Sequence, residues 1–402
     1  MSYSFEEVLQ FVREDDVKFI RMAFCDVFGK QRNISIMPDE LEKAFRYGVA
    51  IDGSAVAGFG CDIHSDLILH PDPSTLSILP WRPEHGRVVR MFCNITNPDG
   101  TPFESDARSF LGKAIKAAED EGIRFAFGSE MEFYLFKRNE QGNPTGIPYD
   151  NAGYMDIAPE DKGENIRREV CLTLEQMGIY PVSSHHEEGP GQNEINFKYS
   201  APMQAADDAV TFKSVVNTIS ARNGLYSDFS PKPIKDCAGN GMHINISAVK
   251  KDGESVMQYV VAGILKHMRE MNVFFNPTAE SYKRLGNHKA PAYVSWSKEN
   301  RSQLIRIPAH EEGNPRAELR SPDSTCNPYL AYAMIIYAGL DGVKNSLPIP
   351  EAKDVNLFDA TPEVASGLEK LPGSLEEAKA LALESAFVRK TVPAGIMEAF
   401  LG

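Results

Sequence analysis

Two glutamates lie two residues apart in an otherwise apolar stretch, GSEMEFYLF at 128–136. Residues i and i+2 of a β-strand point to the same face, so Glu130 and Glu132 would lie side by side. Neighbouring carboxylates among apolar residues repel each other and lose hydration, which is unfavourable unless a cation joins them. The spacing therefore predicts a strand whose polar face binds a cation.

Three further segments place polar side chains on predicted strands: GMHINIS (241–247), RAELRS (316–321) and HHEEGPGQNEINF (185–197). One strand of this kind is most simply the solvent-exposed face of an antiparallel sheet. Four such strands in one domain, rich in Glu, instead suggest strands that converge on a polar cavity. The polar positions are Glu130, Glu132, Glu187, Glu194, His243, Asn245, Ser247, Arg316, Glu318 and Arg320.

The chemistry of this set points to metal ions and phosphate. Five glutamates and one histidine, with no thiolate, suit Mg²⁺ or Mn²⁺ better than structural zinc, and two metals would balance five carboxylates better than one. Arginines, which bind phosphate or carboxylate, occur at Arg284, Arg301, Arg306, Arg316 and Arg320. Metals and arginines without an obvious nucleophile indicate phosphoryl transfer. The sequence contains no GxxxxGK[ST], so a P-loop is excluded.

The whole-chain properties exclude several classes of protein. The net charge of −14, with no basic stretch, argues against a nucleic-acid partner. The six cysteines are scattered without a CxxC pair, which indicates reduced thiols and not a zinc site or disulfide framework. The longest apolar run, LAYAMIIYAGL (330–340), is too short to span a bilayer, and the N-terminus lacks a signal-peptide pattern. We therefore expect a soluble cytoplasmic protein without membrane association.

The 402 residues exceed the usual size of one domain and predict two. Short apolar runs separated by turn residues in the first hundred residues predict a strand-rich unit, with a helix near each end of its first fifty. The turn TNPDGTPFESD (96–106) predicts a boundary, after which strands and helices interleave. Helices are expected at 107–121, at 164–177, at 203–223 and from a capping box of Ser374 and Glu377 to about 383.

Several blocks of the sequence, in their order along the chain, resemble the signature blocks of the type I glutamine synthetases. They are SEMEFYLF, SHHEEGPGQNEI, GNGMHINIS, NRSQLIRIP and RAELRSPD, with further matches at IDGSAVAGF (51–59), NPDGTPFE (97–104) and SYKRL (281–285). The resemblance covers nearly the whole chain. It implies an α+β fold with a β-grasp-like domain at 1–104 and a catalytic domain at 105–402, whose curved antiparallel sheet, a half-barrel, is backed by helices.

The resemblance also implies a reaction and its cofactors. In that family the cavity holds ATP and two divalent metals, Mg²⁺ or Mn²⁺. The γ-phosphoryl group of ATP is transferred to the glutamate side chain, and ammonia displaces the resulting acyl phosphate, since a carboxylate oxygen leaves poorly until it is phosphorylated. By position, the two sets of metal ligands would be Glu132, Glu187 and Glu194, and Glu130, His243 and Glu318.

The other contacts implied by the resemblance divide among three subsites. ATP would be bound by Tyr199, Ser247, Arg301, Arg306 and Arg316, and Arg301 would neutralise charge on the transferring phosphoryl group. Glutamate would be bound by Glu132, Tyr154, Gly239, Arg284 and Arg320. Glu187 and Tyr154 belong to the amine site, which Asp52 of a neighbouring subunit would complete by helping to bind or deprotonate ammonium. A ring with active sites between subunits follows.

The chain departs from the family pattern near the amine site. The flap over the glutamate site is shortened to GNHK (286–289), and Lys289 stands where the family has a glutamate. Ala55 and Ala238 replace a Ser and an Asn of the family. A lysine facing an ammonium pocket would repel a second cation by about 1–4 kcal/mol at ~4 Å. The alternative is that Lys289 points to solvent. Phe358 takes the position that is adenylylated in some members and has no hydroxyl to modify.

Three functions stay open from the sequence. The first is a glutamate–ammonia ligase, the second a γ-glutamyl ligase that uses another amine with the same metals and ATP, and the third a non-catalytic structural or regulatory relative. The C-terminus at AFLG is shorter than is usual in the family. It leaves both a hexameric ring and a double-ring dodecamer open.

Overall fold

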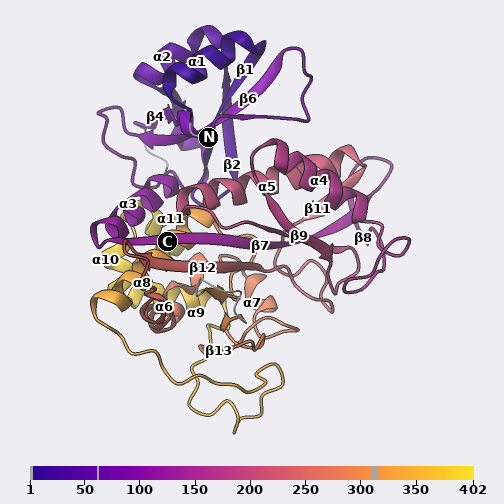
Figure 1. Ribbon diagram of the computed structural model, residues 1–402, viewed down its shortest axis with the longest axis vertical. Helices are drawn as coiled ribbons and strands as arrows, with labels where there is room; N and C mark the ends of the chain where they lie inside the picture. The colour runs from indigo at the N-terminus through magenta and orange to yellow at the C-terminus, as the bar shows by residue number, and fades with distance from the viewer. Residues whose placement is uncertain (1–2, 61–62, 309–315) are drawn as a thin grey trace.

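The computed structural model describes residues 3–60, 63–308 and 316–402, with a small N-terminal unit above a larger one in Figure 1. In the small unit the sheet has the strand order β2-β1-β6-β4-β3, with β5 paired to β6. β1 and β6 are parallel, and the other neighbours are antiparallel. The elements are α1 (Phe5–Glu14), β1 (Val17–Cys25), β2 (Gln31–Ile36), η1 (Pro38–Glu40), α2 (Leu41–Tyr47), β3 (Val49–Asp52), η2 (Gly53–Ala55), β4 (Asp66–Pro71), η3 (Pro73–Thr75), β5 (Ser77–Ile78) and β6 (Arg87–Thr96). The expected strand-rich unit with two flanking helices is confirmed.

The larger unit is built on a curved sheet of order β13-β14-β15-β12-β7-β10-β9, and β8 and β11 also pair with β7. Neighbouring strands are antiparallel except for β13 and β14. The strands are β7 (Ile123–Arg138), β8 (Pro144–Pro148), β9 (Pro181–His186), β10 (Gln192–Phe197), β11 (Leu225–Asp228), β12 (Met242–Lys250), β13 (Trp296–Lys298), β14 (Ile305–Ile307) and β15 (Ala317–Leu319). The expected half-barrel is therefore confirmed.

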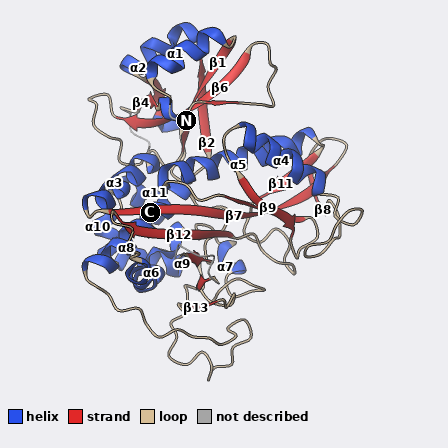
Figure 2. Cartoon of the chain, in the orientation of Figure 1, coloured by secondary structure: helices blue, strands red, loops and turns tan. Residues whose placement is uncertain are grey.

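Helices cover the apolar face of this sheet: α3 and α5 pack on β7, and α6 packs on β12 (Figure 2). Phe127 of β7 stacks on Tyr332 of α8 with ring centroids 4.5 Å apart. The helices are α3 (Ala107–Asp120), α4 (Glu164–Gln176), α5 (Pro202–Arg222), α6 (Met257–Met271), η4 (Asn272–Phe274), α7 (Ser281–Arg284), α8 (Pro328–Lys344), α9 (Leu375–Glu384), α10 (Ala386–Thr391) and α11 (Ala394–Leu401). Among the described residues, no helix is both long and apolar enough to cross a membrane.

The register of the central strands places the polar residues opposite one another. Glu130 of β7 is paired with His243 of β12, and Glu132 of β7 is paired with Glu194 of β10. Met131, which lies between the two glutamates, points the other way and is fully buried in the core. Because side chains alternate along a strand, one sheet both buries an apolar face under helices and presents an acidic face.

A buried arginine joins the two units. Arg108, near the start of α3, donates to both carboxylate oxygens of Asp207 on α5, at 3.1 and 3.0 Å. The same guanidinium donates to Asp72 at 2.9 Å and to Asn94 at 2.7 Å, both in the N-terminal unit. The boundary predicted between 104 and 105 falls just before α3 and stays a prediction.

The predicted helix bounds are confirmed, whereas the predicted capping box is incomplete. The helices expected at 107–121, 164–177 and 203–223 are confirmed within one residue at each end. The capping box expected at Ser374 is incomplete: its hydroxyl accepts from the amide of Glu377, but the Glu377 carboxylate accepts from Gly373 and not from Ser374. The described cysteines are free thiols, and Cys61 lies outside the described residues.

Candidate active site

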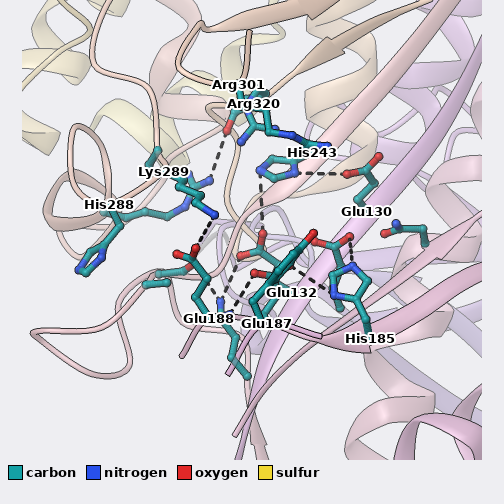
Figure 3. Close-up of a pocket in the computed structure, with 18 of the residues that line it drawn as sticks. Glu130, Glu132, His185, Glu187, Glu188, His243, His288, Lys289, Arg301 and Arg320 are labelled. Atoms are coloured by element: carbon teal, nitrogen blue, oxygen red, sulfur yellow. Dashed lines mark hydrogen bonds and ion pairs between the residues drawn. The ribbon is translucent and has the colours of Figure 1, made fainter. Parts of the chain in front are cut away.

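A cavity of about 470 Å³ opens on the acidic face of the larger sheet (Figure 3). It is bounded by β7, β9, β10 and β12 and by the loops that follow α7 and β13. Of the residues predicted from the sequence, those that line it are Glu130, Glu132, Tyr154, Glu187, Glu194, Gly239, His243, Arg284, Arg301, Arg306 and Arg320. Residues from distant parts of the chain thus meet in one polar space.

The carboxylates surround His243. Its Nδ1 lies 3.4 Å from Oε2 of Glu130 and 3.5 Å from Oε1 of Glu318, and its Nε2 lies 4.0 Å from Oε1 of Glu132. Ligand atoms of Glu130, Glu194 and His243 all lie within 4.8 Å of one another, close enough to share one metal ion. Glu130 and Glu194 come from different predicted ligand sets, so the two sets adjoin each other around this histidine.

The electrostatic surroundings give the glutamates of the cavity different pKa values. Burial, together with the neighbouring charge of Glu194, raises the pKa of Glu132 and that of Glu187 to about 7. Burial would also raise the pKa of Glu130, but the hydrogen bond and charge of His243 outweigh it and lower the pKa. For Glu132 and Glu187, therefore, burial and the charge of Glu194 outweigh the effect of the positive neighbours.

Glu132 is held in place by the loop before β12 and by the first residue of β10. Its Oε2 accepts a hydrogen bond of 2.7 Å from the amide of Gly241 and one of 3.3 Å from Nε2 of Gln192. The same Gln192 amide lies 3.2 Å from the carbonyl oxygen of Gly239. Sequence reasoning missed Gln192, although it lies in QNEINF two residues before Glu194 and so on the same strand face.

Glu318 is fully buried and pairs with arginines. It accepts a hydrogen bond of 2.7 Å from Nη1 of Arg320 and forms a second ion pair with Arg306. Burial would raise its pKa, but the charge of Arg320 and then that of His243 outweigh it and lower the pKa. The predicted metal ligand is thus also the anchor of two predicted substrate-binding arginines.

His185 is a second residue that sequence reasoning missed. Its Nε2 lies 3.4 Å from Glu194 and its Nδ1 lies 3.5 Å from Glu187, and the three residues could hold a metal ion. The hydrogen bond to Glu194, opposed by burial, raises the pKa of His185 to about 9. A signal existed in HHEE, because residues 185 and 187 share a face of an extended strand.

The neighbouring His186 points the other way and forms a second cluster. It is fully buried and its Nε2 lies 2.9 Å from Oδ1 of Asp150, which also accepts from the amide of Gly191. Asp161, the third member, is paired with Arg167. Because its members already have protein partners, we read this cluster as support for the turn that carries Glu187.

Arg284 and the glycines around it form the floor of the cavity. Arg284 is buried and donates to the carbonyl oxygens of Ser321, at 2.8 Å, and Arg320, at 3.3 Å. A Cβ atom on Gly239 would lie 2.3 Å from the carbonyl oxygen of Pro231 and 2.9 Å from Cγ of Arg284. A side chain at Gly239 would therefore displace the arginine.

Five predicted residues do not line this cavity: Asp52, Tyr199, Ser247, Arg316 and Glu318, although Glu318 contacts His243, which does. Asp52, in the N-terminal unit, accepts hydrogen bonds from the amide and hydroxyl of Ser54 at 2.9 and 2.7 Å. Burial raises the pKa of the Tyr199 hydroxyl, and the adjacent Arg316 acts against this rise. Ser247 lies further along β12, where it pairs with Ala126.

Both units of the chain match family models of known proteins. Residues 16–98 match the model of the glutamine synthetase β-grasp domain, and residues 104–402 match that of the glutamine synthetase catalytic domain. The chain belongs to the glutamine synthetase family. It is 42% identical to the glutamine synthetase of Clostridium saccharobutylicum, over 97% of this chain and 91% of that one, and 43% identical to that of Methanosarcina mazei, over 98% and 92%.

Solved structures share this fold. One described as a GmaS/ADP complex superposes with a TM-score of 0.88 at 26% identity, covering 98% of this chain and 93% of that one. An apo GmaS structure is similar, with a TM-score of 0.88 at 27% identity. With these relatives, the expectation of a type I member is confirmed. This glutamine synthetase is a ligase that couples ATP to the synthesis of glutamine from glutamate and ammonia.

The flap, residues 286–289, lies at the cavity. Lys289 is one of the lining residues and forms an ion pair with Glu188, although 55% of its side chain remains exposed. Of the two orientations considered from the sequence, Lys289 therefore takes the one that faces the cavity, with solvent on its other side. Its partner Glu188 was not singled out from the sequence.

Proposed function

We propose that the cavity is the catalytic centre of this glutamine synthetase and that two divalent cations, Mg²⁺ or Mn²⁺, bind there. The observation that carries this proposal is the convergence of four glutamates and one histidine, from three strands and a turn, on one cavity, with a fifth glutamate, Glu318 of β15, 3.5 Å from that histidine. Their carboxylate and imidazole donors are those that hard divalent cations prefer. The proposed ligands are Glu132, Glu187 and Glu194 for one cation and Glu130, His243 and Glu318 for the other.

The surroundings of the carboxylates support cation binding. For Glu132 and Glu187, burial and the charge of Glu194 outweigh the positive neighbours and raise the pKa values. Bound divalent cations would offset this negative charge and that of the ATP phosphates. For Glu318 to take part, its pairing with Arg306 or Arg320 must loosen, and phosphate or carboxylate groups of the substrates are suitable new partners for these arginines.

We assign each arginine of the cavity to one of the two substrates, ATP or glutamate. Arg301 and Arg306 would contact the phosphates of ATP, and Arg301 would neutralise charge on the transferring group. Arg284, which packs against Gly239, and Arg320 are both buried and would bind the carboxylates of glutamate. Such groups accelerate phosphoryl transfer mainly by holding the donor and acceptor in line and by countering charge. Tyr199, Ser247 and Arg316 would contact the nucleotide beyond the lining of the cavity.

We further propose that chains assemble into a ring in which Asp52 completes a neighbour's site. Asp52 does not line the cavity of its own chain, yet hydrogen bonds from Ser54 and Ser65 fix its exposed carboxylate. A fixed, exposed carboxylate could help to bind ammonium and accept its proton, together with Glu187 and Tyr154 in the adjoining cavity. Both a single and a double ring are compatible with this arrangement.

The catalytic-centre proposal is tested by substitution of one carboxylate. Glutamine and phosphate formation would be measured with ATP, glutamate, ammonium and either Mg²⁺ or Mn²⁺. Glu130→Gln should lower kcat at least ~100-fold, because it removes a charged ligand from a dry site. The control is Glu140→Gln, in the exposed turn after β7, which should retain activity. Equal activity of both variants would rule out this cavity as the catalytic centre.

A further inference from the structure

The ammonium group of Lys289 lies where a carboxylate and an aromatic ring meet at the mouth of the cavity. Its Nζ forms an ion pair with Oε1 of Glu188 (Figure 3). The same Nζ lies 5.4 Å from the centroid of the Tyr154 ring. A carboxylate and the face of an aromatic ring are the two groups that most favour a small organic cation. The flap thus places its own primary ammonium between them.

The three residues come from segments that are far apart in the sequence. Lys289 belongs to the flap after α7, Glu188 to the turn between β9 and β10, and Tyr154 to the loop before α4. The Tyr154 ring meets the His185 ring edge to face, with centroids 5.5 Å apart. His185 in turn contacts Glu187 and Glu194, so the position of Lys289 borders directly on the carboxylate cluster.

From this geometry we infer that Glu188 and Tyr154 form a cation subsite of the amine-binding region, and that Lys289 occupies it as a tethered competitor of the amine substrate. The inference rests on the proposed function, since it assumes that amines enter through this mouth. The ligand class is ammonium and short primary alkylammonium ions, which carry the same head group as lysine. Lys289 is thus a specificity-determining residue. It limits the affinity for amines and also determines which amines can bind.

The exposure of the pair supports an exchangeable occupant and not a fixed structural contact. The side chain of Lys289 is 55% exposed and that of Glu188 is 33% exposed. Ion pairs at this exposure are weak and readily exchanged, and the four-carbon stem of lysine is flexible. An amine can therefore displace the lysine from the subsite, but it must do so against a competitor whose local concentration is high.

Two substitutions separate the charge of Lys289 from its volume. Lys289→Met removes the charge but keeps a long side chain, so it should lower the KM for ammonium by roughly threefold to tenfold. Lys289→Ala also removes the stem, so it should in addition raise kcat/KM for methylammonium and ethylammonium. Neither change should alter kcat with saturating ammonium or the KM for ATP. The matched control is Lys283→Met, whose lysine pairs with the exposed Glu280 at 2.7 Å and does not line the cavity.

The pairing is tested in a Glu188→Gln background. There the subsite has lost its carboxylate, so adding Lys289→Met should no longer lower the ammonium KM. If Lys289→Met had an unchanged ammonium KM and a normal kcat, the lysine would have no role in amine binding. That result would overturn this inference but leave the proposed function standing. A collapse of kcat with unchanged KM would overturn the inference as well, because it would assign Lys289 to the reaction itself. If the wild-type protein formed no glutamine, the proposed function would fail first and the inference with it.

Discussion

At the scale of single residues, Glu132 and Glu187 are carboxylates in surroundings that favour protonation. Burial and the nearby Glu194 raise the pKa of each to about 7, well above the ordinary value of a glutamate. A raised pKa in the folded state gives stability that is present below the unfolded pKa and is lost as pH rises through about 7. Without a cation, the site therefore destabilises the fold more as pH rises.

This sign leads to a prediction about cations. Mg²⁺ or Mn²⁺ should raise the melting temperature more at about pH 8 than at about pH 6, because at the lower pH the cation competes with protons. The measurement is a thermal melt with and without the metal at each pH. Glu132→Gln should reduce the metal-induced rise at the higher pH. A rise that is equal at both pH values in the wild type would contradict the assigned protonation.

The alternation of side chains along a strand predicted some residues of the candidate site but could not predict others. Glu130 and Glu132 stand out because acids are rare in an apolar strand. Glu188 could not be found in this way, since it lies in a turn, where no fixed alternation applies, and its partner is 101 positions away at Lys289. Pairing between distant turns depends on the tertiary fold, which no local pattern reports.

At the scale of elements, the antiparallel pairing of β7 with β12 and β10 decides which acids meet. A shift of one residue in either pairing would turn the carboxylates of that strand to the helical face. The buried alternate residues, such as Met131 and Ile244, fix the register because they must face the core. The strands and the long helices were therefore predictable from periodicity. The pairing of β15 with β12 was not, because β15 spans only Ala317–Leu319.

The loop before β12 offers a steric test. Gly239→Ala should raise the KM for glutamate at least ~10-fold, because its Cβ would lie 2.3 Å from the Pro231 oxygen and would push Arg284 aside. The control is Gly112→Ala in α3, where the nearest atom would be 3.8 Å away. Steady-state kinetics for glutamate and ATP would separate the effects. A normal glutamate KM in Gly239→Ala would remove Arg284 from the proposed substrate contacts.

At the scale of the whole molecule, the proposed ring can be tested by mixing inactive subunits. Asp52→Ala and Arg301→Ala chains should each be inactive, whereas an equal mixture should regain about a quarter of the wild-type activity, because one interface in four pairs the two intact surfaces. Activity would be measured after subunit exchange, followed by mass spectrometry. If a fully exchanged mixture regained no activity, Asp52 and Arg301 would not form a shared site between neighbouring chains. They would then act within one chain or at unrelated sites.

The buried cluster around Arg108 bears on how such assemblies acquire their shape. Arg108 has carboxylate partners on both sides of the junction, Asp207 in the larger unit and Asp72 in the smaller. Separating the units would strip a buried guanidinium of part of its neutralisation, which is costly in a dry interior. The tilt of the small unit is therefore set within each chain. In the proposed ring, the angle at which one copy would present Asp52 to the next, and hence the curvature of the ring, would be an intramolecular property that exists before any second chain arrives.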